Sequence, residues 1–182
     1  MGLKNSSEQF GTVAKYLHWL VAAGILILLF LGIEQSDMER GDARTYIRFI
    51  HASLATVVFM LMTARLVWRF VSPPPGHPDG IPGWQRMSTS LVHWGLYICV
   101  FVQLSAGAML TATGGKGLPM FGFFSIWLPV EEDHDKHEWW EGIHGFMWRP
   151  LAALITLHVL AALYNHFVIK NDVLRRMTIG TK

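Results

Sequence analysis

The stretch that decides the fold is the apolar run from residue 143 to residue 169, IHGFMWRPLAALITLHVLAALYNHFVI. Arg149 is its only charged residue, and Lys170 closes it. A helix needs about 20 apolar residues to cross the hydrocarbon core of a bilayer. The proline at position 150 kinks or begins such a helix without abolishing the span. The stretch therefore predicts a membrane-spanning helix.

Three further runs of this kind precede it. The first is YLHWLVAAGILILLFLGI at residues 16–33, the second extends from Phe49 to Val71, and the third lies within residues 87–115, which hold no charge. The four runs predict membrane spans at about residues 15–34, 47–71, 87–113 and 143–170. We expect a single all-α domain over residues 1–182, folded as an integral membrane four-helix bundle.

The composition of the 182 residues agrees with a membrane protein. Hydrophobic residues make up 52% of the chain and charged residues 15%, whereas a soluble domain carries about 25% charged residues. A water-soluble enzyme is therefore nearly excluded. The single cysteine excludes an internal disulfide framework and a cysteine-ligated iron–sulfur cluster. The net charge of +2 is too small to indicate nucleic acid as a partner.

Basic residues are divided unevenly between the two sides of the membrane. The side with the N-terminus, the connection between the second and third spans and the C-terminal tail has nine basic and three acidic residues. The other side has six basic and ten acidic residues. Because cytoplasmic loops are enriched in Lys and Arg, we expect both termini to be cytoplasmic. The acidic, histidine-rich run EEDHDKHEWWE at residues 131–141 is then an external loop.

Four histidines lie in or beside the spans, where ionisable side chains usually mark a functional site. His18 is near the cytoplasmic end of the first span, and His51 is near the external end of the second. His144 and His158 lie on the fourth helix, 14 residues apart. Fourteen helical steps return to within about 40° of the same face and rise about 21 Å. The fourth helix therefore presents two imidazoles on one face at two depths.

This arrangement predicts two sites of two histidines each, His18 with His158 and His51 with His144. Imidazoles on both faces of a planar macrocycle hold a b-type haem, and the absence of a C-x-x-C-H motif excludes covalent attachment. Two haems at two depths form a path for single electrons across the membrane. A zinc site would instead need three or four ligands at one depth.

His166 is an alternative to His158 on the fourth helix. It follows His144 by 22 residues, and 22 helical steps also return to within about 40° of the same face. Periodicity alone does not choose between the two. The rise of about 33 Å to His166 would separate two irons too far for good electron transfer, so we prefer His158.

The chain resembles the bacterial cytochrome b561 family over nearly its whole length. The resemblance rests on an ordered set of stretches: LHWL around His18, FIHASLATVVFMLMTARLVWRFVSPPPG around His51, VHWGLY in the third span, IHGF and TLHVLAALYNHF on the fourth, and KNDVLRRMTIG in the tail. Members of this family are four-helix di-haem proteins of the bacterial inner membrane that exchange electrons with quinone. By position, the family's axial ligands correspond to His18, His51, His144 and His158.

The resemblance implies that the chain carries single electrons between a periplasmic-side donor and membrane quinone. Some family members are similar to superoxide oxidases, which oxidise superoxide and reduce ubiquinone. The acidic run at residues 131–141 departs from the closer family pattern, and it would repel a superoxide anion. An alternative is an electron-transfer subunit that docks a periplasmic redox protein through this run. A third alternative, from another class, is a histidine-lined metal transporter.

Two more residues join the expected cofactor-binding set. His93 opens the third span, where it could bind a haem propionate, carry protons to a quinone or serve a structural role. Arg149 lies at a span end, where a guanidinium pairs with a propionate or extends to the membrane surface; the same holds for Arg48, Arg65 and Arg69. Four side chains of the acidic run could bind a divalent metal, although a solvated loop suits their loose spacing better: Glu131, Asp133, His134 and His137.

Overall fold

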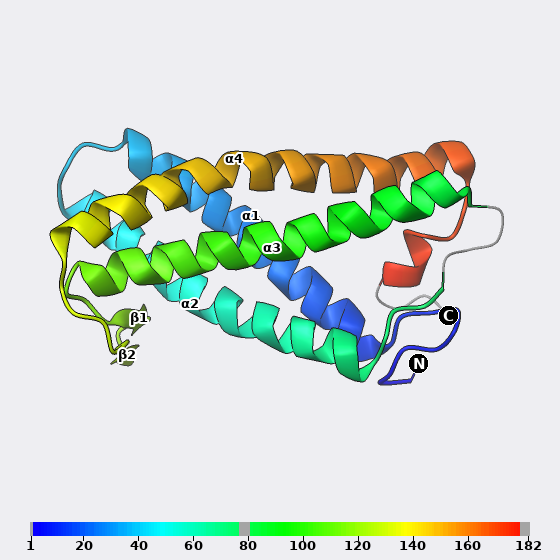
Figure 1. The fold of residues 1–182 in the computed structure, drawn as a ribbon, viewed down its shortest axis with the longest axis horizontal. Coiled ribbons are helices and arrows are strands. Elements are labelled where there is room, and N and C mark those ends of the chain that lie inside the picture. The colour runs from blue at the N-terminus through cyan, green and yellow to red at the C-terminus, as the bar shows by residue number, and fades with distance from the viewer. Residues whose placement is uncertain (1, 77–80, 179–182) are drawn as a thin grey trace. The chain divides into compact units, whose positions relative to one another are not determined.

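The computed structural model describes residues 2–76 and 81–178. Within these residues, four helices are long and apolar enough to cross a membrane. They are α1 (Thr12–Asp37), α2 (Asp42–Val71), α3 (Gly83–Thr113) and α4 (His134–Tyr164), and a π-helical turn, Asn165–Ile169, extends α4 (Figure 1). A short 3₁₀ turn, Arg175–Met177, follows near the C-terminus. The expectation of four membrane-crossing helices is confirmed.

The helices present large apolar side chains on their surface, as lipid-facing helices do. Leu26 and Phe30 of α1 and Ile98 of α3 are exposed. A soluble helix would bury such a stripe against a core. In a bilayer these side chains face acyl chains, and the backbone hydrogen bonds are satisfied within each helix.

The described residues form two compact units, and each of the four helices contributes one part to each unit. Unit 1 draws on residues 1–20, 63–99 and 149–182. Unit 2 draws on residues 21–62 and 100–148. The described segments before α1 and after α4 therefore belong to the same unit.

Hydrogen bonds hold the terminal segments of unit 1 to its helices. The backbone N–H of Asn5 donates to Ser72 Oγ at 2.9 Å, and the Asn5 side-chain amide donates to the Ser72 carbonyl at 2.7 Å. The Trp19 indole N–H donates to the carbonyl of Met177 at 2.9 Å. These bonds order the segments before α1 and after α4 against the same unit.

A close helix contact organises unit 2. A Cβ added at Gly24 of α1 would lie 2.5 Å from Val58 Cγ2 of α2, and Val58 is almost completely buried. The two helices can approach this closely only because position 24 has no side chain. Deeper in the same unit, the rings of Phe59 and Phe101 pack edge to face with centroids 5.9 Å apart.

A short β-hairpin lies in the connection between α3 and α4, and the sequence did not predict it. Strands β1 (Leu118–Met120) and β2 (Phe124–Ile126) pair antiparallel, with Pro119 opposite Ser125. The turn between them has positive φ at both Phe121 and Gly122, which is the geometry of a type I′ hairpin turn.

The acidic run at residues 131–141 is mostly helical, which corrects its interpretation as a loop. Helix α4 begins at His134 because Asp133 caps it. Asp133 Oδ1 accepts the backbone N–H of Lys136 at 3.0 Å, and Asp133 Oδ2 lies 2.8 Å from Lys136 Nζ. These bonds to Lys136 lower the pKa of the exposed Asp133 carboxyl. An aspartate before an apolar helical run is a helix-start signal, and the charge density of the run obscured it.

Helix α4 also continues through Pro150. Proline has no N–H, so the carbonyl four residues earlier, at Phe146, loses its helical partner. Membrane helices tolerate this loss where neighbouring groups satisfy the freed carbonyl. The consequence for the site is that His144 and His158 lie on one continuous helix.

Candidate functional site

The first histidine pair lies in unit 1. The ring centroids of His18 (α1) and His158 (α4) are 6.2 Å apart, and the ring planes are inclined by 69°. The ring of His93 (α3) also approaches His158, with centroids 5.3 Å apart. Three helices of the unit therefore bring an imidazole to one place. The sequence predicted the first two as a pair and His93 as a neighbour.

Helix α2 contributes two buried nitrogen atoms without hydrogen-bond partners to unit 1. Arg65 of α2 donates from Nε to the Tyr97 hydroxyl at 3.3 Å, but its Nη1 is buried and has no hydrogen-bond partner. The indole N–H of Trp68 is buried and unpartnered as well. The charge of Arg65 acts on both His18 and His158. A buried donor without a partner costs roughly 1–3 kcal/mol, so this side of the pair is built to receive an acceptor.

The second pair lies in unit 2 and repeats the same spacing. The ring centroids of His51 (α2) and His144 (α4) are 6.2 Å apart, and the planes are inclined by 82°. Nδ1 of His51 is buried without a hydrogen-bond partner. Each unit thus holds its own pair of imidazoles, and the two pairs have the same centroid separation although the residues around them differ.

Gln103 of α3 sets the orientation of His144, and sequence reasoning missed it. His144 Nδ1 lies 3.1 Å from the backbone carbonyl of Gln103. Because a carbonyl only accepts, Nδ1 carries the proton and Nε2 keeps its lone pair. The Gln103 side-chain Nε2 lies 3.3 Å from His144 Nε2, while its Oε1 is buried without a partner. A metal-binding imidazole usually donates its other ring N–H to a hydrogen-bond acceptor, which fixes the lone pair on the nitrogen that binds the metal.

Glycines leave space beside both rings of the second pair. A Cβ at Gly107 would lie 3.0 Å from His144 Cε1, and one at Gly32 would lie 3.6 Å from His51 Cε1. At position 107 the ring occupies the volume that any side chain would need.

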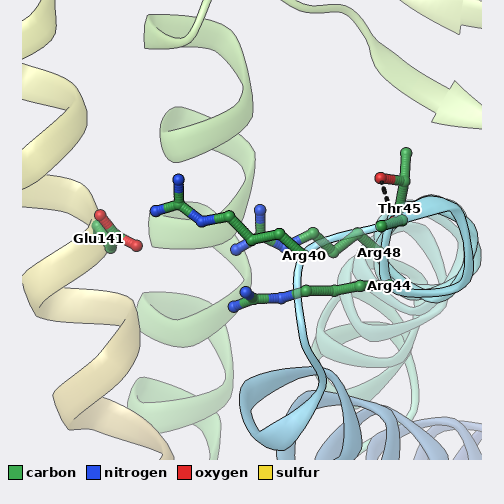
Figure 2. Close-up of a pocket in the computed structure, with 6 residues that line it drawn as sticks. Arg40, Arg44, Thr45, Arg48 and Glu141 are labelled. Carbon is green, nitrogen blue, oxygen red and sulfur yellow. Dashed lines mark hydrogen bonds between the residues drawn. The ribbon is translucent and has the colours of Figure 1, made fainter.

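A basic pocket opens near the second pair, also in unit 2. Arg40, Arg44 and Arg48 extend from the start of α2 and the turn before it toward one opening, with Glu141 of α4 on its far side (Figure 2). The pocket has a volume of about 460 Å³, and Gly41 and Thr45 complete its lining. Arg44 Nε is buried without a partner. Arg48 precedes His51 by three residues, about one helical turn. The count of charges predicted an acidic surface here, but this pocket is locally basic.

The other candidate residues lie elsewhere or have partners of their own. His166 lies in the π-helical turn with its ring 4.8 Å from that of Phe167, so His158 and not His166 faces His18. His137 Nδ1 bonds the Leu110 carbonyl at 2.9 Å, and His134 pairs with Glu138. In the described part of the chain, residues 131–137 do not converge as a metal site. Arg149 lies in α4, next to Pro150.

Comparison with known proteins identifies the family. Residues 9–180 match the family model of prokaryotic cytochrome b561. The chain belongs to this family. Two relatives are Escherichia coli (strain K12) proteins named cytochrome b561 homolog 2, 25% identical over 97% of this chain and 95% of its own length, and cytochrome b561 homolog 1, 31% identical over 93% and 97%. A Yersinia pestis protein named probable superoxide oxidase is 26% identical over 88% of this chain and 90% of its own length.

Membership in the cytochrome b561 family implies electron transfer in a bacterial membrane that the chain crosses several times, and it implies b-type haem. The residues present fit such a group. Two imidazoles that bind one metal ion from opposite sides have centroids about 6 Å apart, since metal–nitrogen bonds are about 2 Å long. Both pairs have this separation. Arg65 Nη1 in unit 1 and His51 Nδ1 in unit 2 are buried without hydrogen-bond partners, so each is available to bond such a group.

Proposed function

We propose that this cytochrome b561 holds two haems b and transfers single electrons between an external donor and membrane quinone. The observation that carries the proposal is the pair of histidine sites, one in each unit, at the same centroid separation of 6.2 Å. Bound haem supplies reversible one-electron redox chemistry, which no side chain of this chain offers. All other parts of the proposal concern what the protein's own residues do.

The imidazoles of His18 and His158 would hold one haem, and those of His51 and His144 the other. The Gln103 carbonyl keeps the proton of His144 on Nδ1, so Nε2 retains the lone pair that would bind the iron in place of the Gln103 side-chain amide. Arg65 has a free buried donor for a propionate in unit 1.

We infer the orientation from the excess of basic residues on the side that holds both chain ends. This places both chain ends on the cytoplasmic side of the inner membrane. We propose that the external donor reacts beside the His51–His144 pair and that ubiquinone is reduced beside the His18–His158 pair. His93, which lies against His158, is placed to bind a propionate or to pass protons to the quinone.

The experiment that tests this function is a reduced-minus-oxidised visible spectrum of the detergent-purified protein, with haem measured per chain. We expect two haems per chain and a sharp b-type α band, because each unit provides its own axial pair. A colourless protein would reject the redox function and leave the histidines to metals or structure. One haem per chain would reject the second site.

The basic pocket favours superoxide as the external donor. Arg40, Arg44 and Arg48 offer three positive charges against the single carboxylate of Glu141. Such a cluster raises the local concentration of a small anion even where the net charge of the surface is negative. Each superoxide would lose one electron and leave as dioxygen, and ubiquinone would take up two electrons and two protons. A periplasmic redox protein docked on the acidic start of α4 is the second candidate donor.

Replacing Arg48 by glutamine is expected to slow superoxide-driven quinone reduction several-fold, roughly in the range of electrostatic steering effects. The rate should also lose part of its dependence on ionic strength. The matched control is Lys116→Gln, which removes one positive charge from an exposed position of the same unit. Stopped-flow kinetics in proteoliposomes, normalised to haem content, measure both variants. Equal slowing in both, or in neither, would reject the pocket as the entry site and favour a redox protein as donor.

A further inference from the structure

The segment of residues 117–130, GLPMFGFFSIWLPV, contains the β-hairpin and has no charged residue. Its large side chains are nevertheless exposed: Phe123 is 87% exposed, Trp127 71% and Phe124 58%. Lys116 and Glu131 flank the segment. Soluble surfaces rarely expose a contiguous apolar patch of this kind unless it binds something.

The hairpin lies beside α2 at the level of the second histidine pair. The backbone N–H of Phe121 donates to Ser53 Oγ at 3.2 Å, and Ser53 is fully buried. A Cβ at Gly122 would lie 4.0 Å from Phe49 Cζ. Ser53 is two residues after His51 and four residues after Phe49, where the apolar run of α2 begins. The hairpin tip therefore lies against the first turn of the apolar part of α2, from Phe49 to Ser53, which extends about 6 Å along the helix axis.

The backbone at the tip supports a fixed position. Phe121 has a φ of 51°, a left-handed conformation that is unfavourable for a residue with a bulky side chain. Such a conformation persists only where surrounding contacts enforce it. The bond to Ser53 is such a contact, and it holds the tip against α2.

We propose that this hairpin lies in the interfacial layer of the bilayer and that Phe123, Phe124 and Trp127 contact lipid. Contact with the first turn of the apolar part of α2 fits an interfacial element, which buries an apolar face by about 5–10 Å. The outer strand edges leave backbone groups that need water or headgroups, so the hydrocarbon centre is excluded. The flanking charges of Lys116 and Glu131 fit the headgroup level, and Trp is enriched there.

Lipid suits this surface better than a protein partner. The patch offers no charge for a partner to recognise, and it lies alongside a helix that already crosses the membrane. The inference stands apart from the proposed electron transfer, because it uses neither the histidine pairs nor a bound cofactor. In this position, the connection between α3 and α4 would also shield α2 beside His51 from water.

Site-directed spin labelling of the full chain in proteoliposomes tests the proposal. Cys99 is the single cysteine, so a Cys99→Ser background accepts one new thiol at a time. Phe123→Cys carries the probe on the hairpin. Leu26→Cys on the exposed face of α1 is the lipid reference, and Glu131→Cys just after the segment is the water reference.

The nitroxide at position 123 is expected to collide often with oxygen and rarely with a water-soluble nickel chelate, as the label at position 26 does. Frequent collision with nickel, as at position 131, would overturn the proposal and place the hairpin in water. Protection of the label from both reagents would also overturn the proposal. Spin–spin broadening that disappears on dilution with unlabelled chains would then show that a second copy of this chain covers the hairpin. Without such broadening, a different protein would be the cover.

A second measurement uses the unmodified chain in case the variants fail to fold. A carbene reagent dissolved in the bilayer is photolysed, and the modified residues are mapped by mass spectrometry. We expect modification at Phe123, Phe124 and Trp127 and none at residues 131–133. Modification confined to the four helices would contradict lipid contact.

Discussion

Alanine in place of His51 is expected to lower the haem content from two to one per chain. The ring of His51 faces only His144 among the proposed ligands, and both belong to unit 2. His18 and His158 lie in unit 1 with their own surroundings, so their haem should stay. Pyridine haemochrome analysis and a redox titration of the α band measure the result, and a single midpoint potential should remain.

The matched control is His166→Ala. His166 lies on the same continuous helix region, but its ring packs against Phe167 and not against another proposed ligand. We expect two haems per chain in this variant. If His166→Ala lost a haem, His166 would replace His158 as the proposed ligand on the fourth helix. Loss of both haems or of neither from His51→Ala would refute the pairing in unit 2.

Valine in place of Gly107 is expected to weaken haem binding at the His51–His144 pair without replacing either histidine. Its Cβ would lie 3.0 Å from His144 Cε1 and 3.2 Å from Nδ1, so the ring must move and its bond to the Gln103 carbonyl must break. Overpacking of this kind costs about 1–3 kcal/mol, which lowers the affinity of that site about 10- to 100-fold. Haem titration of the apoprotein measures the change.

Gly142→Val is the control for this substitution. It places the same side chain in α4, where a Cβ has no neighbour within 4 Å. Both variants introduce a β-branched residue into a helix, so any general effect on helix stability is shared. Retention of two tightly bound haems in Gly107→Val would show that the close contact with His144 is not needed for haem binding.

The sequence predicted those features that repeat along a helix. Long uncharged runs indicated the four helices, and the 14-residue spacing brought His144 and His158 to one face. The structure then places the predicted partners His18 and His51 beside them, while the ligand roles stay predictions. The basic pocket had a readable signal in the spacing of Arg40, Arg44 and Arg48 by four residues, but the net charge of that side concealed it.

Features that depend on backbone atoms or tertiary contacts were not predictable. Gln103 acts on His144 through its main-chain carbonyl, which any residue could supply. The hairpin turns at Phe121 and Gly122, and a phenylalanine in a left-handed turn position is not a turn signal. Its place beside α2 depends on Ser53, 68 residues earlier in the chain, and such a distant bond leaves no local pattern.

Helix α4 supplies one imidazole to each proposed pair, and this sets the order of events during biosynthesis. His51 is made 93 residues before His144. At about 5–20 residues per second, it waits roughly 5 to 20 seconds for its partner, and His18 waits longer for His158. Until α4 is inserted, neither half of the protein can hold haem by two ligands. A ribosome stalled between α3 and α4 therefore leaves a membrane-inserted chain without a complete site, and cofactor loading follows the insertion of the fourth helix.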